Sequence, residues 1–295
     1  MYDVDYSERD ISFKLEGKSF DDGYDFNDTL ASLNYFQDIL DKAYLTIVNK
    51  DRMSKVDRAV FKIKATDIRH GSFITDLMLY TGAAIQVAYP VINRYYPSLL
   101  LDVTKQGFEY LKTVLKANKE DKKISINYDG EGDVMVLSIE GDNNAPININ
   151  TKAFMFAGKA YGSIKDLSSL IDGENIKSVD ISDKTGKRNI INLGVEEKKI
   201  LNVESKIDET PINITGKIFR IDIWAKSGKL LVIESDDNSL IDSEISFEIM
   251  DDDDIKRCCS VIDKEVKFSV LRKTQYDPST LKDQVKSLKI FRIYK

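Results

Sequence analysis

The chain has 295 residues, of which 42% are apolar and 31% are charged, the balance of a folded soluble protein rather than of a disordered one. Its formal net charge of −6 does not attract the whole protein to nucleic acid or to an anionic membrane. The single histidine, His70, and the two adjacent cysteines, Cys258 and Cys259, lack the spacing of a metal site or of an activated nucleophile. We therefore expect no metal, no cofactor and no enzymatic activity. The absence of a disulfide framework and the acidic, polar start of the chain favour a reducing, cytoplasmic location.

The first two thirds of the chain alternate between strand and helix patterns. Period-2 alternation predicts strands, turn residues between paired strands predict three hairpins, and apolar residues at helical spacing predict helices. The expected strands are 11–15, 60–68, 73–79, 124–128, 134–139, 179–182 and 189–193, and the expected helices are about 28–47, 83–89, 97–116, 151–171 and 196–203. If this region has two parts, they divide at the charged connector 116–123.

From about Pro211 the segments become short, alternating and rich in β-branched residues. Strands are expected at 212–224, 229–234, 244–250, 266–273 and 285–294, with a short helix at 251–258. This pattern predicts a small five-stranded OB-like β-barrel. The fold class is therefore α+β, with a mixed α/β interaction domain at 1–205 and a barrel domain at 206–295.

Two short sequence motifs resemble those of a group of two-part bacterial proteins. In that group an N-terminal α+β region contains a hairpin with Gly-Ser-Phe, here Gly71-Ser72-Phe73, and a five-stranded barrel opens with a phrase like Ile214-Thr215-Gly216-Lys217-Ile218. The resemblance implies this same two-part architecture and brings no catalytic residues. It also implies an association with mobile elements or with antiviral (phage) defence.

The charge of the barrel region is divided between an acidic and a basic stretch. Residues 234–254 carry ten acids and no base, whereas residues 264–295 carry nine bases and three acids. Basic residues interleaved with aromatic ones on an OB-like barrel are typical of a surface that binds single-stranded nucleic acid. The candidate contacts are Arg272, Lys273, Tyr276, Lys289 and Arg292. In the interpretation that we favour, the charged residues instead face solvent and the aromatic ones fill the core.

Three further patterns favour structural explanations. The run Asp251–Asp254 is expected to begin a helix, where carboxylates stabilise the positive end of the dipole, rather than to hold an ion. Glu265-Val266-Lys267 matches a metal-dependent nuclease triplet that a Lys-rich chain contains by chance. Ala157-Gly158-Lys159-Ala160 lacks the earlier glycine of a phosphate-binding loop.

Residues 77–93 contain no charged side chain. This length is near the minimum for a membrane span, but Pro90, Gln86 and Gly82 interrupt it. A buried helix or an interface with a partner is the better explanation, and membrane contact is not expected. The candidate interface residues are Val87, Ile92, Leu99 and Leu100.

These observations together predict a binding or scaffold subunit of a multi-protein bacterial assembly, with a protein partner or a homo-oligomer. The alternative is a nucleic-acid-binding protein that uses the basic strands at the end of the barrel.

Overall fold

The computed structural model describes residues 11–69, 72–81, 96–128, 134–140, 146–183 and 188–294. The chain divides into two compact units, Met1–Asn202 and Val203–Lys295, called below the first unit and the barrel unit. The expected helix at 83–89, with Val87, and also His70 and Ile92, lie outside the described residues.

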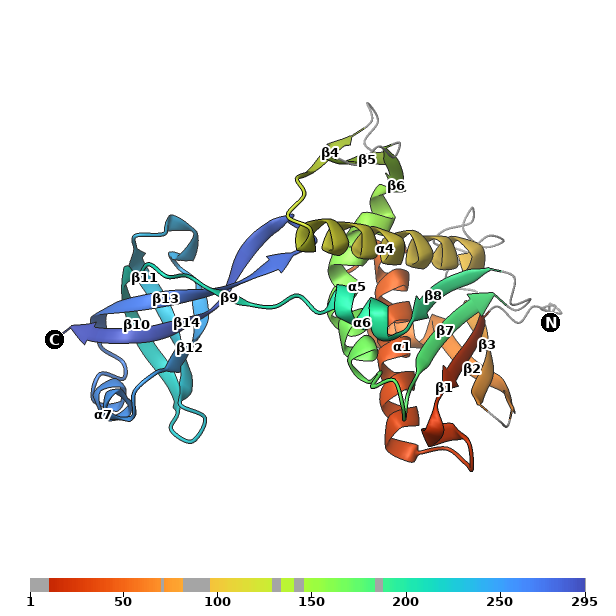
Figure 1. Ribbon diagram of the computed structural model, residues 1–295, viewed down its shortest axis with the longest axis horizontal. Helices are drawn as coiled ribbons and strands as arrows, with labels where there is room; N and C mark the ends of the chain where they lie inside the picture. Colours follow the sequence, from red (N-terminus) through yellow and green to blue (C-terminus); the bar gives the residue numbers. More distant parts are fainter. Residues whose placement is uncertain are drawn as a thin grey trace. The chain divides into compact units, whose positions relative to one another are not determined.

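The first unit is built on a five-stranded antiparallel sheet (Figure 1). Its strand order is β2-β3-β1-β7-β8. The strands are β1 (Ile11–Glu16), β2 (Phe61–Arg69), β3 (Phe73–Thr81), β7 (Ser178–Asp183) and β8 (Asn189–Leu193). Alternate residues of the central strand, Ile11, Phe13 and Leu15, are fully buried, as expected for a sheet with one face on the core.

Helices cover that buried face. The long ones are α1 (Phe26–Ile47), α4 (Tyr96–Lys119) and α5 (Thr151–Ser169), and they pack against one another. Phe36 of α1 stacks on Phe13 of the sheet, with 4.7 Å between ring centroids. The Asp25 carboxylate caps α1 by accepting a hydrogen bond from the Asp28 N–H at 3.0 Å, which satisfies a backbone donor that the helix leaves free. The shorter helices are α2 (Lys55–Val60), α6 (Val195–Leu201) and the 3-10 turn η1 (Lys18–Phe20).

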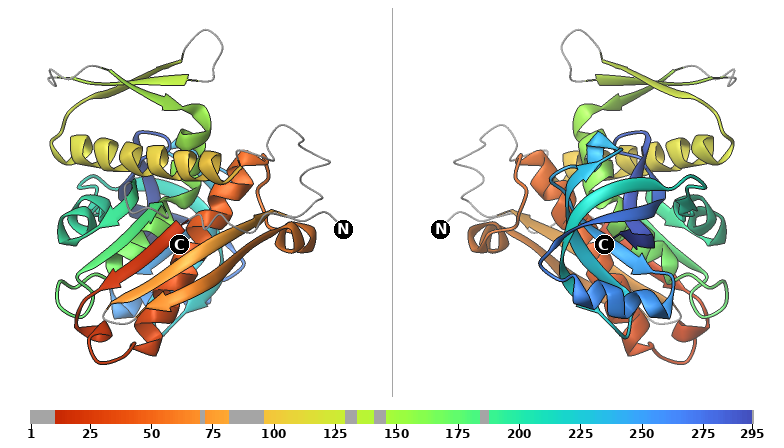
Figure 2. Two further views of the ribbon diagram at one scale, coloured as in Figure 1. Left: turned by 90° about the vertical axis from the view of Figure 1, so that its right-hand side faces the viewer. Right: turned by 90° about the vertical axis from the view of Figure 1, so that its left-hand side faces the viewer.

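A second, smaller sheet of the first unit lies over α4, away from the five-stranded sheet (Figures 1 and 2). It is antiparallel in the order β4-β5-β6, formed by β4 (Ile124–Tyr128), β5 (Val134–Ile139) and β6 (Ile147–Asn150). The register places apolar side chains alone on one face, namely Ile124, Ile126, Tyr128, Met135, Leu137, Ile139, Ile147 and Ile149. Met135, Leu137 and Ile149 are buried, whereas Tyr128 and Ile147 remain 60% and 41% exposed.

The barrel unit is a closed five-stranded β-barrel, as the sequence predicts. Its strands are β10 (Ile212–Asp222), β11 (Ser227–Ser235), β12 (Glu244–Ile249), β13 (Glu265–Asp277) and β14 (Lys282–Tyr294). They pair in the order β10-β11-β12-β14-β13, and β13 closes the barrel on β10. Only the β12–β14 pairing is parallel, and α7 (Asp252–Ser260) connects the third strand to the fourth. The short β9 (Lys206–Ile207) extends the sheet beside β13, and the 3-10 turn η2 (Asn238–Leu240) follows β11.

The α+β class and the OB-like barrel are confirmed, and the differences are local. The helix expected to end near Lys116 continues to Lys119, into the charged connector. The sequence analysis did not predict α2, β6 or β9. Each has six residues or fewer, too few for a periodic pattern to stand out.

Candidate binding surfaces

The loop between β10 and β11 is anchored by a hydrogen bond to the Asp222 side chain and by a backbone hydrogen bond to β12. Residues Ile223–Lys226 form the turn. The Asp222 carboxylate accepts a hydrogen bond from the Ala225 N–H at 2.9 Å, a local side-chain-to-backbone bond that closes the turn. Lys226 adopts φ 49°, and its carbonyl accepts a hydrogen bond from the Ile249 N–H at 2.8 Å. The hairpin end is therefore anchored to β12.

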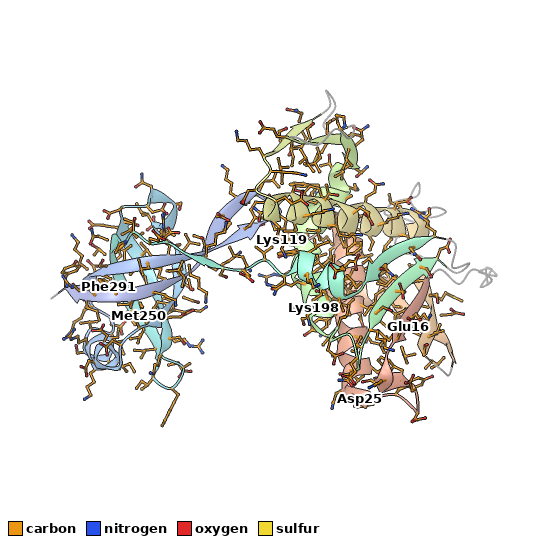
Figure 3. The ribbon with its side chains drawn as sticks, in the orientation of Figure 1. Glu16, Asp25, Lys119, Lys198, Met250 and Phe291 are labelled. Carbon is orange, nitrogen blue, oxygen red and sulfur yellow. The ribbon has the colours of Figure 1, made fainter. Side chains whose placement is uncertain are left out.

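This anchored loop carries Trp224, the only tryptophan of the chain, with 97% of its surface exposed. Three further large apolar side chains are more than half exposed on the same unit: Ile223 at 55%, Met250 at 56% and Phe291 at 55%. Met250 and Phe291 lie near one another (Figure 3) and line one shallow depression with Lys226. Ile223 lines a second depression with Cys259 of α7. We call Ile223, Trp224, Met250, Cys259 and Phe291 the barrel-tip surface. Exposed apolar residues gathered in this way are typical of an interaction site.

Carboxylates surround the barrel-tip surface. Asp222, Asp251 and Asp253 form no ion pair within the described residues, while Asp254 pairs with Arg257 at 3.0 Å. Asp251 caps α7 by accepting a hydrogen bond from the Asp253 N–H at 3.1 Å, which is the structural role expected for this acidic run. Lys226 and Lys256 line the same two depressions, and the aspartates outnumber them, so the surface is acidic on balance.

The two cysteines differ in accessibility. Cys258 is buried in the barrel core, and burial, with a smaller effect of the Asp254 charge, raises the pKa of its thiol to about 12. Cys259 is partly exposed. Only Cys259 is therefore placed to react with a thiol reagent in the folded protein.

The residues predicted to bind nucleic acid do not form one cationic face. The Arg272 guanidinium forms ion pairs with Asp208 and Asp237, both at 2.6 Å, whereas Lys273 and Lys289 contact Glu248 at 2.9 and 3.7 Å. Arg272 and Lys273 are neighbours on one strand, so their side chains point to opposite sides of the sheet. Arg272 and Lys273 therefore do not share a face, and acids partly neutralise Arg272, Lys273 and Lys289.

Tyr276 is also unsuited to the predicted stacking role. Its side chain is only 7% exposed, and burial, with smaller effects of Asp283 and Asp277, raises its pKa to about 12. A ring in this position cannot stack on a nucleic acid base. Arg292 is exposed on β14, as a binding residue would be.

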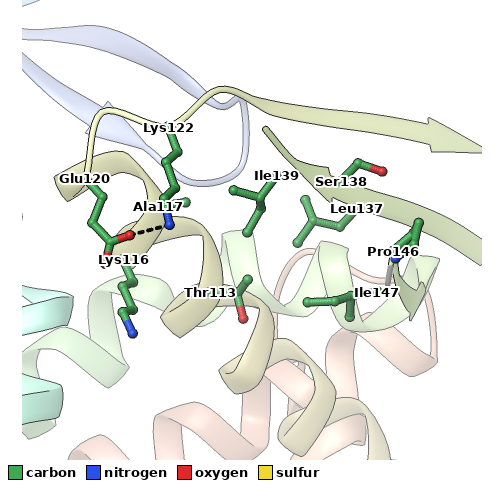
Figure 4. Close-up of a pocket in the computed structure, with 10 residues that line it drawn as sticks. All are labelled: Thr113, Lys116, Ala117, Glu120, Lys122, Leu137, Ser138, Ile139, Pro146 and Ile147. Atoms are coloured by element: carbon green, nitrogen blue, oxygen red, sulfur yellow. Dashed lines mark ion pairs between the residues drawn. The ribbon is translucent and has the colours of Figure 1, made fainter. Parts of the chain in front are cut away.

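A cavity lies between α4 and the apolar face of the small sheet (Figure 4). Its volume is about 550 Å³, within the range of ligand pockets. Leu137, Ile139 and Ile147 point from the sheet toward Thr113 and Ala117 of α4. Lys116, Glu120 and Lys122 stand at the helix end of the cavity, where Lys122 pairs with Glu120 at 2.7 Å. We call this cavity the α4 pocket.

Of the four residues predicted at an interface, two lie in the described part of the chain. Leu100 is fully buried in the core of the first unit, so its predicted role is wrong: it packs inside its own unit. Leu99, beside it on α4, is partly exposed. Among the described residues no helix is long and apolar enough to cross a membrane.

A polar cluster joins α1 to α5 in the first unit. Lys42 forms an ion pair with Asp38 at 2.7 Å, and both contact the hydroxyl of Ser163. Burial opposes ionisation of Asp38, but the hydrogen bonds from Lys42 and Ser163 outweigh it and lower its pKa. Ser163 is 4% exposed and hydrogen-bonds to both members of the Lys42–Asp38 ion pair, so the cluster connects the two helices. No group of three or more His, Cys, Asp or Glu residues that could share a metal ion occurs among the described residues.

Comparison with protein-family models, with curated proteins and with solved structures found no match for this chain. The barrel-tip surface and the α4 pocket are therefore the features of the molecule that indicate a function.

Proposed function

We propose that this protein is a non-enzymatic binding subunit that docks a protein partner through its barrel tip. The observation that carries the proposal is the position of Trp224, 97% exposed on a loop that Asp222 and β12 hold in place. Tryptophan is among the residues that contribute most to protein interfaces, and a fixed loop loses little conformational entropy on binding. Ile223, Met250 and Phe291 add apolar surface around this anchor.

A protein partner is supported better than nucleic acid. Carboxylates surround the barrel-tip surface, and Tyr276, the predicted stacking residue, is buried. Of the predicted cationic contacts, Arg272 is paired with two aspartates and Lys273 and Lys289 with Glu248. The wider placement in a bacterial assembly with a role in defence rests on the two-part resemblance.

The test compares affinity capture by the wild-type chain and by the Trp224→Ala variant from cells that express the chain natively. Phe26→Ala is the matched control, because Phe26 is also an exposed aromatic residue, 72% exposed, but belongs to the first unit. We expect a stoichiometric protein partner with the wild type and with Phe26→Ala, and its loss with Trp224→Ala. Removing a fully exposed side chain should leave the barrel folded.

The reconstituted complex supplies a second readout. Docking should shift the emission of Trp224 to shorter wavelength and protect Cys259 from a maleimide reagent. Equal capture of the partner by Trp224→Ala would contradict the proposal. Co-purification of nucleic acid with the wild type, lost in the Arg292→Ala variant, would favour the alternative.

A further inference from the structure

We propose that the partner of the barrel tip is a second copy of this chain, and that Trp224 of one copy enters the α4 pocket of the next. This inference rests on the proposed docking role of the barrel tip and identifies the acceptor. The shape, the polarity and the charge of the α4 pocket support its role as the acceptor.

The first argument is shape. Trp224 projects from a hairpin loop as a convex anchor, so its acceptor must be concave. The α4 pocket has a volume of about 550 Å³. A pocket of this size accommodates an indole, which buries about 150–250 Å² when fully covered.

The second argument is polarity. The side chains on one face of the small sheet are all apolar by register, and those of Leu137, Ile139 and Ile147 line the α4 pocket together with the polar Ser138 and Thr113. That apolar face is incompletely covered within its own unit: Ile147 remains 41% exposed. Leu137, Ile139 and Ile147 line the side of the pocket opposite the helix (Figure 4). An apolar face of this kind gains free energy when a second apolar surface covers it, at about 25 cal/mol per Å² of buried area.

The third argument is charge. Four lysines cluster around the C-terminal end of α4, at positions 116, 119, 122 and 123, beside Glu120 and Asp121. Lys116 lines the pocket and forms no ion pair with any described residue. The barrel tip is acidic on balance: Asp222, Asp251 and Asp253 form no ion pair in the described part of the chain, and they outnumber Lys226 and Lys256, the lysines that line its two depressions. Complementary charges around an apolar anchor increase the association rate and select the partner.

Because the two contacting surfaces differ, the contact is head-to-tail. After one such contact, the copy that supplied its tip keeps an unused pocket and the other copy keeps an unused tip, so association continues into chains or closes into a ring. This property separates the inference from symmetric dimerisation and determines the experiment.

The experiment is sedimentation velocity on the full-length protein over a concentration series, with Trp224 emission recorded in parallel. We expect the wild type to form larger species as concentration rises, with a blue shift of the emission. Trp224→Ala should weaken association by about thirtyfold or more, the effect of removing an interface hot spot. Ile147→Asp, at an exposed position of the pocket, should do the same by placing a carboxylate in front of the acidic tip. Phe26→Ala serves as the control and should associate like the wild type.

The decisive measurement mixes the two defective variants. Trp224→Ala retains the pocket and Ile147→Asp retains the anchor, so together they should form a one-to-one complex that does not extend further. Association of either single variant like the wild type would overturn the inference, as would a failure of the mixture to form the complex. A wild type that stays monomeric with exposed emission would also overturn it. If Trp224→Ala then still loses another protein in the capture experiment, the docking role stands and only the acceptor is wrong.

Discussion

Replacement of Gly228 by alanine should destabilise the barrel at the root of its Trp224 hairpin. Gly228 pairs with Ile221 of β10 and Phe247 of β12. An added Cβ would lie 2.4 Å from the Arg220 carbonyl oxygen and 2.4 Å from the Phe247 ring. Phe247 is 1% exposed and the carbonyl belongs to a paired strand, so neither can move away freely.

The magnitude follows from these two contacts. Overpacking of a well-filled core costs about 1–3 kcal/mol, and each ladder hydrogen bond lost as the strands separate adds about 1 kcal/mol. We expect Gly228→Ala to lower the free energy of unfolding of the barrel by about 2–4 kcal/mol. Gly162→Ala is the matched control, since a Cβ on this glycine of α5 meets nothing within 4 Å. It should stabilise the first unit by up to about 1 kcal/mol, because alanine favours helix over glycine.

Hydrogen exchange followed by mass spectrometry measures the two units separately in one sample. Gly228→Ala should reduce the protection of peptides from β10, β11 and β12 and leave those of α5 unchanged. Gly162→Ala should change the protection of peptides from the first unit only. If peptides from β11 were as well protected from exchange in Gly228→Ala as in the wild type, the close approach of these strands would be refuted.

Three further predictions concern buried polar groups and the nucleic acid alternative. The Tyr276 hydroxyl is buried without a hydrogen-bond partner in the described part of the chain, so Tyr276→Phe should raise the stability of the barrel by about 1 kcal/mol, measured by hydrogen exchange of β13. Burial opposes ionisation of Asp57, but hydrogen bonds from Lys50, Ser54 and Tyr44 outweigh it and lower its pKa. Its contribution is therefore complete above the unfolded pKa of about 3.9 and is lost as the pH falls through the lower folded value. The stability advantage of the wild type over Asp57→Asn in urea titrations should shrink on acidification below about pH 4. Fluorescence anisotropy at low salt should show no binding of single-stranded or duplex oligonucleotides at micromolar protein; steep salt-dependent binding would contradict this expectation.

Much of the fold could be predicted because each long element has a clear period. The alternation in Ile11–Glu16 and the apolar spacing in Phe26–Ile47 correspond to β1 and α1. The short α2 had a usable signal, since Ser54 and Asp57 form a capping box at its start. The parallel pairing of β12 with β14 had no such signal, because alternation indicates which face is buried and not which strand lies alongside.

The binding surface was missed for a related reason. The sequence analysis treated Trp224 as the last residue of a strand and gave it no role. Its parity was misleading, because Trp224 is an even number of residues from Ile214 and Ile218, both of which are buried. A bulge between Ile218 and Arg220 reverses the two faces of β10, so that Arg220, Asp222 and Trp224 are exposed. A large apolar residue at a solvent-facing position is unexplained by folding and is therefore a candidate for binding. Tyr276 was a surface residue only in the nucleic-acid alternative, and its ring is buried on β13, as the favoured interpretation expects of an aromatic residue.

The barrel has no structural need for its exposed apolar tip. The ladder closes from β13 onto β10, and the core is filled by residues such as Ile218, Leu230 and Phe268. Trp224 adds nothing to that core, yet the hydrogen bond from the Ala225 N–H to Asp222 and the bond from the Ile249 N–H to the Lys226 carbonyl hold its loop in place. A large apolar side chain that contributes no packing and projects from an anchored loop is best explained by a contact with another molecule. The α4 pocket, apolar on its sheet side and lysine-rich at its helix end, has the properties that such a contact requires.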